Sequence, residues 1–114
     1  MEILKFGKEI ARKIGSYNSV SAFYSKLIRT EAPTNIGFIK IEQGGIVGYH
    51  KAPVSQLFLV VEGEGWIEGE DNIRITLKKG EGVFWAKGEG HTSGSETGLT
   101  ALVLQSDELK NPLE

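Results

Sequence analysis

The N-terminal stretch of the chain has the hydrophobic spacing of a helix, unlike the residues that follow it. Phe6, Ile10 and Ile14 recur every four residues, so they share one helical face while charged residues occupy the others. Gly15 follows the last apolar position and is a typical helix stop. The pattern predicts a short amphipathic N-terminal helix over residues 6–15 that packs on the body of the domain.

From residue 19 onward, short hydrophobic runs alternate with glycine-rich breaks. Residues 57–61 are all apolar, as expected for a strand that is covered on both faces. Short strands at near-regular spacing, with turn residues between them, are typical of an antiparallel sandwich or barrel. The chain is therefore predicted to be all-β after the helix, with strands at residues 19–28, 36–42, 56–62, 65–69, 73–77, 83–85 and 99–105.

Composition narrows the classes of partner and of chemistry. The 114 residues, 25% of them charged and 39% hydrophobic, suit one domain with a core of its own. The absence of cysteine excludes a disulfide scaffold, thiolate metal sites and cysteine nucleophiles. A net charge of -2 offers no attraction for nucleic acid, and no apolar run is long enough to cross a bilayer. We therefore expect a cytoplasmic protein with neither a nucleic-acid nor a membrane partner.

Two blocks of glycine and histidine follow one another along the predicted strands, and they hold the only two histidines of the chain. In the first block, five residues separate Gly44 from His50, which is followed by Ala52, Gln56 and Gly63. In the second block, five residues separate Gly80 from Ala86, which is followed by Gly88, His91 and Ser95. In order and in spacing, the two blocks resemble the paired motifs of the cupin superfamily.

The resemblance implies an all-β fold, the cupin double-stranded β-helix, which is a jelly-roll-like antiparallel barrel. Together with the predicted helix, it implies a single cupin domain over residues 1–112, whose barrel covers about residues 19–106. Leu113 and Glu114 are interpreted as the remnant of an expression tag and are left out of the functional argument.

The two motifs depart from the family pattern where metal-dependent cupins bind their ion. In those proteins, two histidines and a glutamate of the first motif, with the histidine of the second, hold a divalent metal. His50 and His91 match two of these positions, but Ala52 replaces the second histidine and has no donor atom. Gln56 replaces the glutamate and offers only a neutral carbonyl oxygen. The resemblance thus implies at most a weak site for Zn, Ni, Fe or Cu, held by His50, His91 and Gln56.

A carboxylate from elsewhere would supply the missing negative charge of such a site. Glu62 is in phase with Gln56 along its strand, and Glu89 lies two residues before His91. Neither glutamate matches a ligand position of the family. The other acidic residues between positions 62 and 71 lie in or beside glycine-rich turns and are interpreted as a solvated rim.

The same residues predict a pocket for a small molecule. Alternation along a strand places His50 with Ala52 on one face, and Gln56 with Phe58 on one face of the next strand. If both faces look into the barrel, the pocket is polar at its mouth and apolar at its depth, which suits a small ligand with a few polar groups. We expect His50, Ala52, Gln56, Phe58 and His91 to line it.

Three functions remain open at this point. The first is a binding module that holds a small polar molecule, such as a sugar or an organic acid, beside an incomplete metal site at His50 and His91. The second is a metal-dependent cupin enzyme, of the dioxygenase, isomerase or lyase type, that uses a weak two-histidine site. The third is a metal-free enzyme in which one histidine acts as general acid or base.

Assembly can also be predicted from the strand pattern. The apolar run from Val20 to Ile28 is long enough to pair with the sheet edge of a neighbouring molecule, and such an edge is a liability in a monomer. We therefore expect a two-fold homodimer. Trp66 and Trp85 are interpreted as core or dimer-packing residues rather than as platforms for a ligand.

Overall fold

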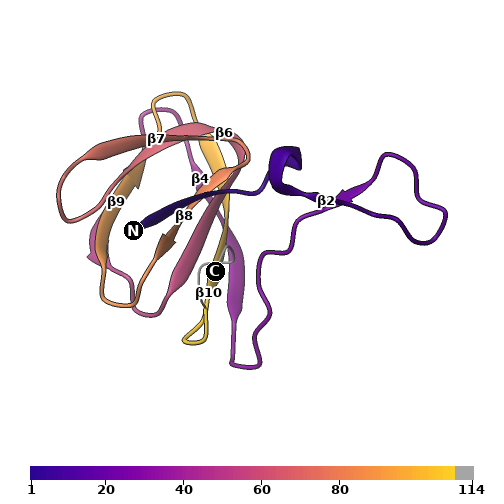
Figure 1. The fold of residues 1–114 in the computed structure, drawn as a ribbon. Helices are drawn as coiled ribbons and strands as arrows, with labels where there is room; N and C mark the ends of the chain where they lie inside the picture. The colour runs from indigo at the N-terminus through magenta and orange to yellow at the C-terminus, as the bar shows by residue number, and fades with distance from the viewer. Residues whose placement is uncertain (110–114) are drawn as a thin grey trace.

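A computed structural model describes residues 1–109 of the chain as a β-barrel from which an N-terminal hairpin projects (Figure 1). The part described contains a single 3-10 turn, η1, and ten strands. In chain order, the elements are β1 Glu2–Lys5, η1 Lys8–Ile10, β2 Arg12–Lys13, β3 Phe23–Tyr24, β4 Asn35–Ile41, β5 Ile46–Lys51, β6 Gln56–Glu68, β7 Arg74–Lys78, β8 Glu81–Trp85, β9 Gly90–Gly94 and β10 Leu99–Gln105.

The long strand β6 joins the two halves of the barrel. Its first half lies between β8 and β10 in a sheet of order β1-β8-β6-β10-β4, and all of these pairings are antiparallel. Its second half lies between β7 and β9, and β9 in turn pairs with β5. The chain is therefore all-β with antiparallel sheets, as the sequence predicts.

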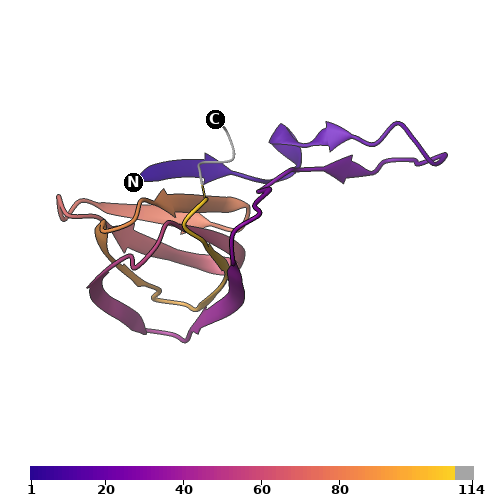
Figure 2. The same ribbon diagram turned by 90° about the horizontal axis from the view of Figure 1, so that it is seen from below.

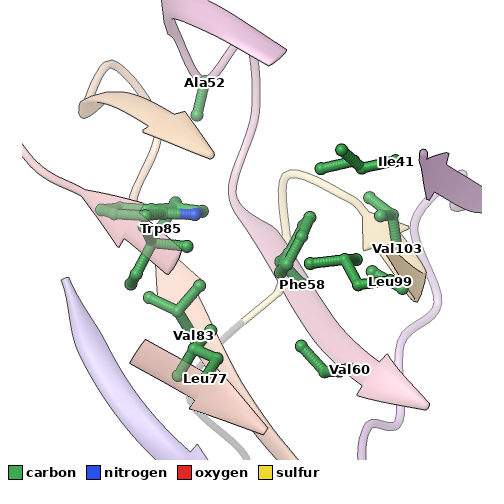
Figure 3. Packing of buried hydrophobic residues seen from close by; sticks show 11 residues of the cluster. Ile41, Ala52, Phe58, Val60, Leu77, Val83, Trp85, Leu99 and Val103 are labelled. Atoms are coloured by element: carbon green, nitrogen blue, oxygen red, sulfur yellow. The ribbon is translucent and has the colours of Figure 1, made fainter. Parts of the chain in front are cut away.

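The first half of strand β6 is buried on both faces, which explains its uninterrupted apolar run. Phe58 and Val60 point into the barrel, where they join a core built from both halves (Figure 3). Leu57 and Leu59 point the other way and form an outer cluster with Leu104 on the outside of the first sheet. The sequence-based prediction of a strand covered on both sides is confirmed at these positions.

The predicted N-terminal helix over residues 6–15 is wrong. Residues 2–5 form strand β1 against β8, and only the 3-10 turn η1 follows before the chain becomes extended again. An amphipathic helix is stable in a protein mainly because its apolar face packs on something. Ile10 is 43% exposed, and the outer cluster is covered instead by Phe6, Leu27 and Ile28. A helix with Ile10 and Ile14 on one face would therefore find no free apolar surface of the barrel to pack on.

The long strand predicted at residues 19–28 is also reduced to a short piece. Only Phe23 and Tyr24 pair, with Lys13 and Arg12 of β2. The resulting hairpin arm, which we define as residues 8–25, extends away from the barrel in both views (Figures 1 and 2). The principal dimensions of 46 × 33 × 22 Å reflect this projection.

No helix within residues 1–109 has the length and apolarity to span a membrane. The interpretation of Leu113 and Glu114 as a tag remnant concerns residues outside this described range.

Candidate functional site

The two histidines face each other across the antiparallel pair of β5 and β9. His50 lies directly opposite His91 in the register, immediately after an irregularity in β5 that follows Val47. Their ring centroids are 4.5 Å apart and the ring planes make an angle of 63°, an edge-on arrangement. The structure thus brings together the histidines of the two motifs, which are 41 residues apart in the sequence.

Backbone carbonyls orient both imidazoles in the same way. The Nδ1 atom of His50 lies 2.8 Å from the carbonyl oxygen of Gly48, and that of His91 lies 3.1 Å from the carbonyl oxygen of Glu89. A carbonyl can only accept a hydrogen bond, so each Nδ1 donates its proton. In the neutral form of each ring, Nε2 therefore carries the lone pair, ready to accept a proton donor or to bind a metal.

His91 is buried against Trp85. Its exposed fraction is 4%, and its ring stacks on the indole with centroids 4.4 Å apart and an angle of 9° between the planes. Burial lowers the pKa of His91 below its ordinary value, and the neighbouring His50 acts in the same direction. The hydrogen bond to the Glu89 carbonyl and the charge of the Glu89 carboxylate oppose these effects without reversing them. His91 is consequently a neutral imidazole at neutral pH.

Gln56 lies at the start of β6, directly opposite Trp85 of β8. Within residues 1–109, neither the Gln56 amide nor the His91 Nε2 atom forms a hydrogen bond with another protein group, although both side chains are buried. In the same range, every fully buried side-chain nitrogen or oxygen has a hydrogen-bond partner. The Gln56 amide and His91 Nε2 must therefore be reached by solvent, as a binding site requires.

The two apolar residues of the predicted pocket belong to the interior core. Ala52 is packed in the same cluster as Trp85, and its backbone joins the strand ends by hydrogen bonds with Glu89 and Gly88. Phe58 packs deeper in the barrel, beside Val103 (Figure 3). The structure places both side chains inside the barrel, while their contact with a ligand stays a prediction.

Neither of the two nearby carboxylates completes a metal site. The Glu89 carboxylate accepts the backbone N–H of Ala86 at 2.9 Å and pairs with the amino group of Met1. Glu62 is exposed and lines a surface hollow of about 400 Å³ with Lys40 and Glu42. No group of three or more His, Asp or Glu side chains suitable for a metal is present in residues 1–109. Two imidazoles and one amide, without an anion, do not reproduce a closed four-ligand centre.

Trp85 is the site residue that the sequence-based analysis missed. We interpreted it as core or dimer packing, and it is indeed almost fully buried, but its indole also supports one face of His91. The signal was present in the pattern, because Trp85 alternates in phase with the buried Val83 and directly precedes the second motif's Ala86–His91 segment. The other tryptophan, Trp66, lies outside this arrangement, with the Arg74 guanidinium 3.7 Å above its ring.

The comparisons with known proteins agree with this architecture. A cupin-like protein from Thermotoga maritima superposes with a TM-score of 0.62 at 22% identity, covering 66% of this chain and 58% of that one. A cupin-2 domain protein from Shewanella frigidimarina gives a TM-score of 0.58 at 23% identity, covering 71% and 78%. The DMSP lyase DddQ from Ruegeria pomeroyi gives 0.63 at 20% identity, with 72% of this chain and 42% of that chain covered.

At these identities the likeness extends to the fold alone, and no curated protein sequence matches the chain. The cupin domain family itself matches residues 37–104, which run from β4 to β10 and include both histidines. This segment is more than half of the chain, and its two motifs meet at one place in the barrel. The protein belongs to the cupin family.

Proposed function

We propose that this cupin binds a small, uncharged polar molecule at the His50–His91 pair. The observation that carries the proposal is the shared orientation of the two imidazoles, because each Nδ1 is engaged by a carbonyl and each Nε2 is left as an acceptor. A ligand with hydroxyl or N–H groups can donate to both nitrogens. The Gln56 amide adds a donor and an acceptor, since its side chain reaches solvent.

The electrostatics of the pair favour a hydroxyl-rich ligand, such as a sugar or polyol, over an organic acid. The pKa of His91 is lowered, so this buried ring brings no positive charge to meet a carboxylate. The stacked Trp85 adds an apolar, rigid wall beside the acceptor. Small-molecule sites commonly combine such walls with a few well-placed polar groups.

The proposal can be tested on protein treated with a chelator, by titrating a panel of sugars, polyols and organic acids. Binding would be followed by calorimetry and by the NMR signals of the two imidazoles. His50→Ala removes one acceptor from an exposed position, so it should keep the fold and weaken binding of a polyol about tenfold. Lys51→Ala is the matched control, because it changes the next residue of β5, on the other face of the strand.

Two results would contradict the proposal. One is a ligand that binds His50→Ala and the unsubstituted protein equally well. The other is a panel in which organic acids bind and no hydroxylated compound does, because carboxylates would require a positively charged group at the site.

The Nε2 lone pairs favour a second candidate function, a metal-dependent enzyme with a weakly held ion. His50 and His91 would be its protein ligands together with Gln56, and a Zn, Ni, Fe or Cu ion would supply a Lewis acid. The fold is shared with a protein described as a DMSP lyase, which supports an enzyme as an alternative but does not identify a substrate for this chain.

Elemental analysis separates the two candidates. The protein is purified without a nickel column, beside His50→Ala. About one metal ion per chain, lost in the variant, would favour the enzyme, whereas less than about a tenth of an ion per chain would favour the binding module.

A further inference from the structure

Three serines of the described part of the chain are buried, and one of them differs from the other two in its hydrogen bonds. The Ser95 hydroxyl donates to the carbonyl oxygen of Glu64 at 2.6 Å. The Ser106 hydroxyl accepts the backbone N–H of Glu108 at 3.3 Å. Ser93 is only 5% exposed, yet its hydroxyl forms no hydrogen bond with any group that the structure describes. A buried hydroxyl without a partner costs free energy, so this one calls for an explanation.

Ser93 faces the inside of the barrel. In the register it lies directly opposite Val47 of β5 on one side and Ile67 of β6 on the other. Ile67 belongs to the interior core, and Val47 packs against that core. Directly paired residues share a face of the sheet, so Ser93 lies on the inner wall between two apolar neighbours.

The position of Ser93 along β9 relates its hydroxyl to the histidine pair. His91 and Ser93 are two residues apart, so they share the inner face of β9, about 7 Å apart along the strand. Because every fully buried side-chain nitrogen or oxygen of residues 1–109 has a hydrogen-bond partner, the Ser93 hydroxyl must border space that water can enter. The same reasoning applies to His91 Nε2. Both polar atoms thus meet such space from one wall of the barrel.

We propose, on the basis of the function proposed above, that Ser93 forms the inner end of the binding site and that the ligand reaches from His91 Nε2 to the Ser93 hydroxyl. A lone water at Ser93 would need two or more polar partners, and the side chains of Val47 and Ile67 supply none. A ligand that is held at His50 and His91 brings a polar group of its own to Ser93. The site therefore suits polyols with three or more hydroxyl groups, two for the imidazoles and one for Ser93, which can both donate and accept.

Two polyols that differ in their number of hydroxyl groups test this extension of the site on chelator-treated protein. Ethylene glycol can engage both imidazoles but has no hydroxyl left for Ser93, whereas xylitol has further hydroxyls. We expect Ser93→Ala to weaken xylitol binding about five- to tenfold in NMR titrations and to leave the affinity for ethylene glycol unchanged. His50→Ala should weaken the binding of both compounds.

Stability measurements separate a binding role of Ser93 from a structural one. Ser93→Ala removes a hydroxyl that has no hydrogen-bond partner in the described part of the chain, so the urea midpoint of the unliganded protein should not fall. Ser95→Ala is the contrasting variant, because it removes two hydrogen bonds and should lower the midpoint. Thr92→Ala is the matched control for binding. It removes a hydroxyl from the neighbouring residue of β9, on the outer face, and should leave the xylitol affinity unchanged.

Four results would overturn the role of Ser93, and only the last would also count against the proposed function. Equal xylitol affinities of Ser93→Ala and the unsubstituted protein, with weaker binding by His50→Ala, would remove Ser93 from a site that still exists. An equal loss for xylitol and ethylene glycol in Ser93→Ala would mean that the substitution acts through the histidines. A lower urea midpoint for Ser93→Ala would assign the hydroxyl to the fold. Failure of both compounds to bind the unsubstituted protein would contradict the proposed function and the role of Ser93 together.

Discussion

The barrel and the hairpin arm contain similar hydrophobic runs and fold to very different extents. In the barrel, β6 continues for thirteen residues, and both faces of its first half are buried. In the arm, the predicted strand shrinks to the two residues Phe23 and Tyr24, both exposed. The difference teaches that an apolar run becomes a long strand where surfaces are available to cover it. Propensity alone leaves such a run extended and weakly paired.

The largest loss of stability is expected on substitution of Trp85, in the interior of the barrel. Trp85→Ala removes a fully buried indole that packs in the core and supports His91. We expect the free energy of unfolding to fall by about 3–5 kcal/mol, measured by urea denaturation followed by circular dichroism. A loss below about 1 kcal/mol would mean that a buried side chain of the barrel contributes no more to stability than an exposed side chain of the arm.

The next largest loss of stability should differ between two glycines of the first motif that have almost the same φ. Gly44 and Gly63 have φ angles of 76° and 77°, but only Gly63 is crowded, because an added Cβ would meet the carbonyl oxygen of Gly98. Gly44→Ala should cost about 1 kcal/mol for the left-handed backbone alone. Gly63→Ala should cost at least about 2 kcal/mol, since strain and overpacking add. Equal losses in the two variants would remove the steric explanation.

A smaller effect concerns pH, and it should be seen in the barrel through His91. Its pKa is lowered on folding, mainly because burial disfavours the charged form. The unfolded chain therefore binds this proton more readily, and stability should decrease as pH falls below the ordinary histidine value of 6.5, levelling off below the pKa of the folded state. His91→Gln should reduce this slope in unfolding curves of chelator-treated protein between pH 7.5 and 5. An unchanged slope would assign the dependence to other groups.

The smallest effect is expected in the arm. Tyr24→Ala should change the free energy of unfolding by less than about 0.5 kcal/mol in urea denaturation, because the Tyr24 side chain is exposed. A loss above about 1 kcal/mol would mean that Tyr24 is packed as a core residue is, against the difference between arm and barrel.

Much of the barrel could be predicted because its residues obey local rules. The alternation of Leu57 and Phe58 onto opposite faces follows from the geometry of a strand, and both faces are buried as expected. The resemblance of the two motifs to those of cupins implied that His50 and His91 meet, and the structure pairs them across β5 and β9. The first feature depends on a short stretch of sequence, and the second on a pair of motifs shared with a known family.

The features that could not be predicted depend on what lies next to a segment in space. Ile10 and Ile14 have helical spacing, but the outer cluster is covered by Leu27 and Ile28, which leaves no surface for a helix. The alternation of Trp85 with Val83 indicates that its indole is buried, but not that it stacks on His91, because the stacking depends on how β8 and β9 approach one another. Strand β1, at Glu2–Lys5, was missed for the same reason, since its pairing with β8 is set by the completed sheet.

The parallel contact between Trp85 and His91 gives the protein an optical reporter of its own. A protonated imidazole in contact with an excited indole quenches its emission, whereas a neutral imidazole does so much less. The fluorescence of Trp85 should therefore follow the charge of His91, and any molecule that captures His91 Nε2 should change its brightness. The second indole, Trp66, lies beneath Arg74 instead and provides a reference signal within the same chain. Binding of a ligand at the His50–His91 pair, as proposed above, should thus be visible in the emission of Trp85, without a dye or a label.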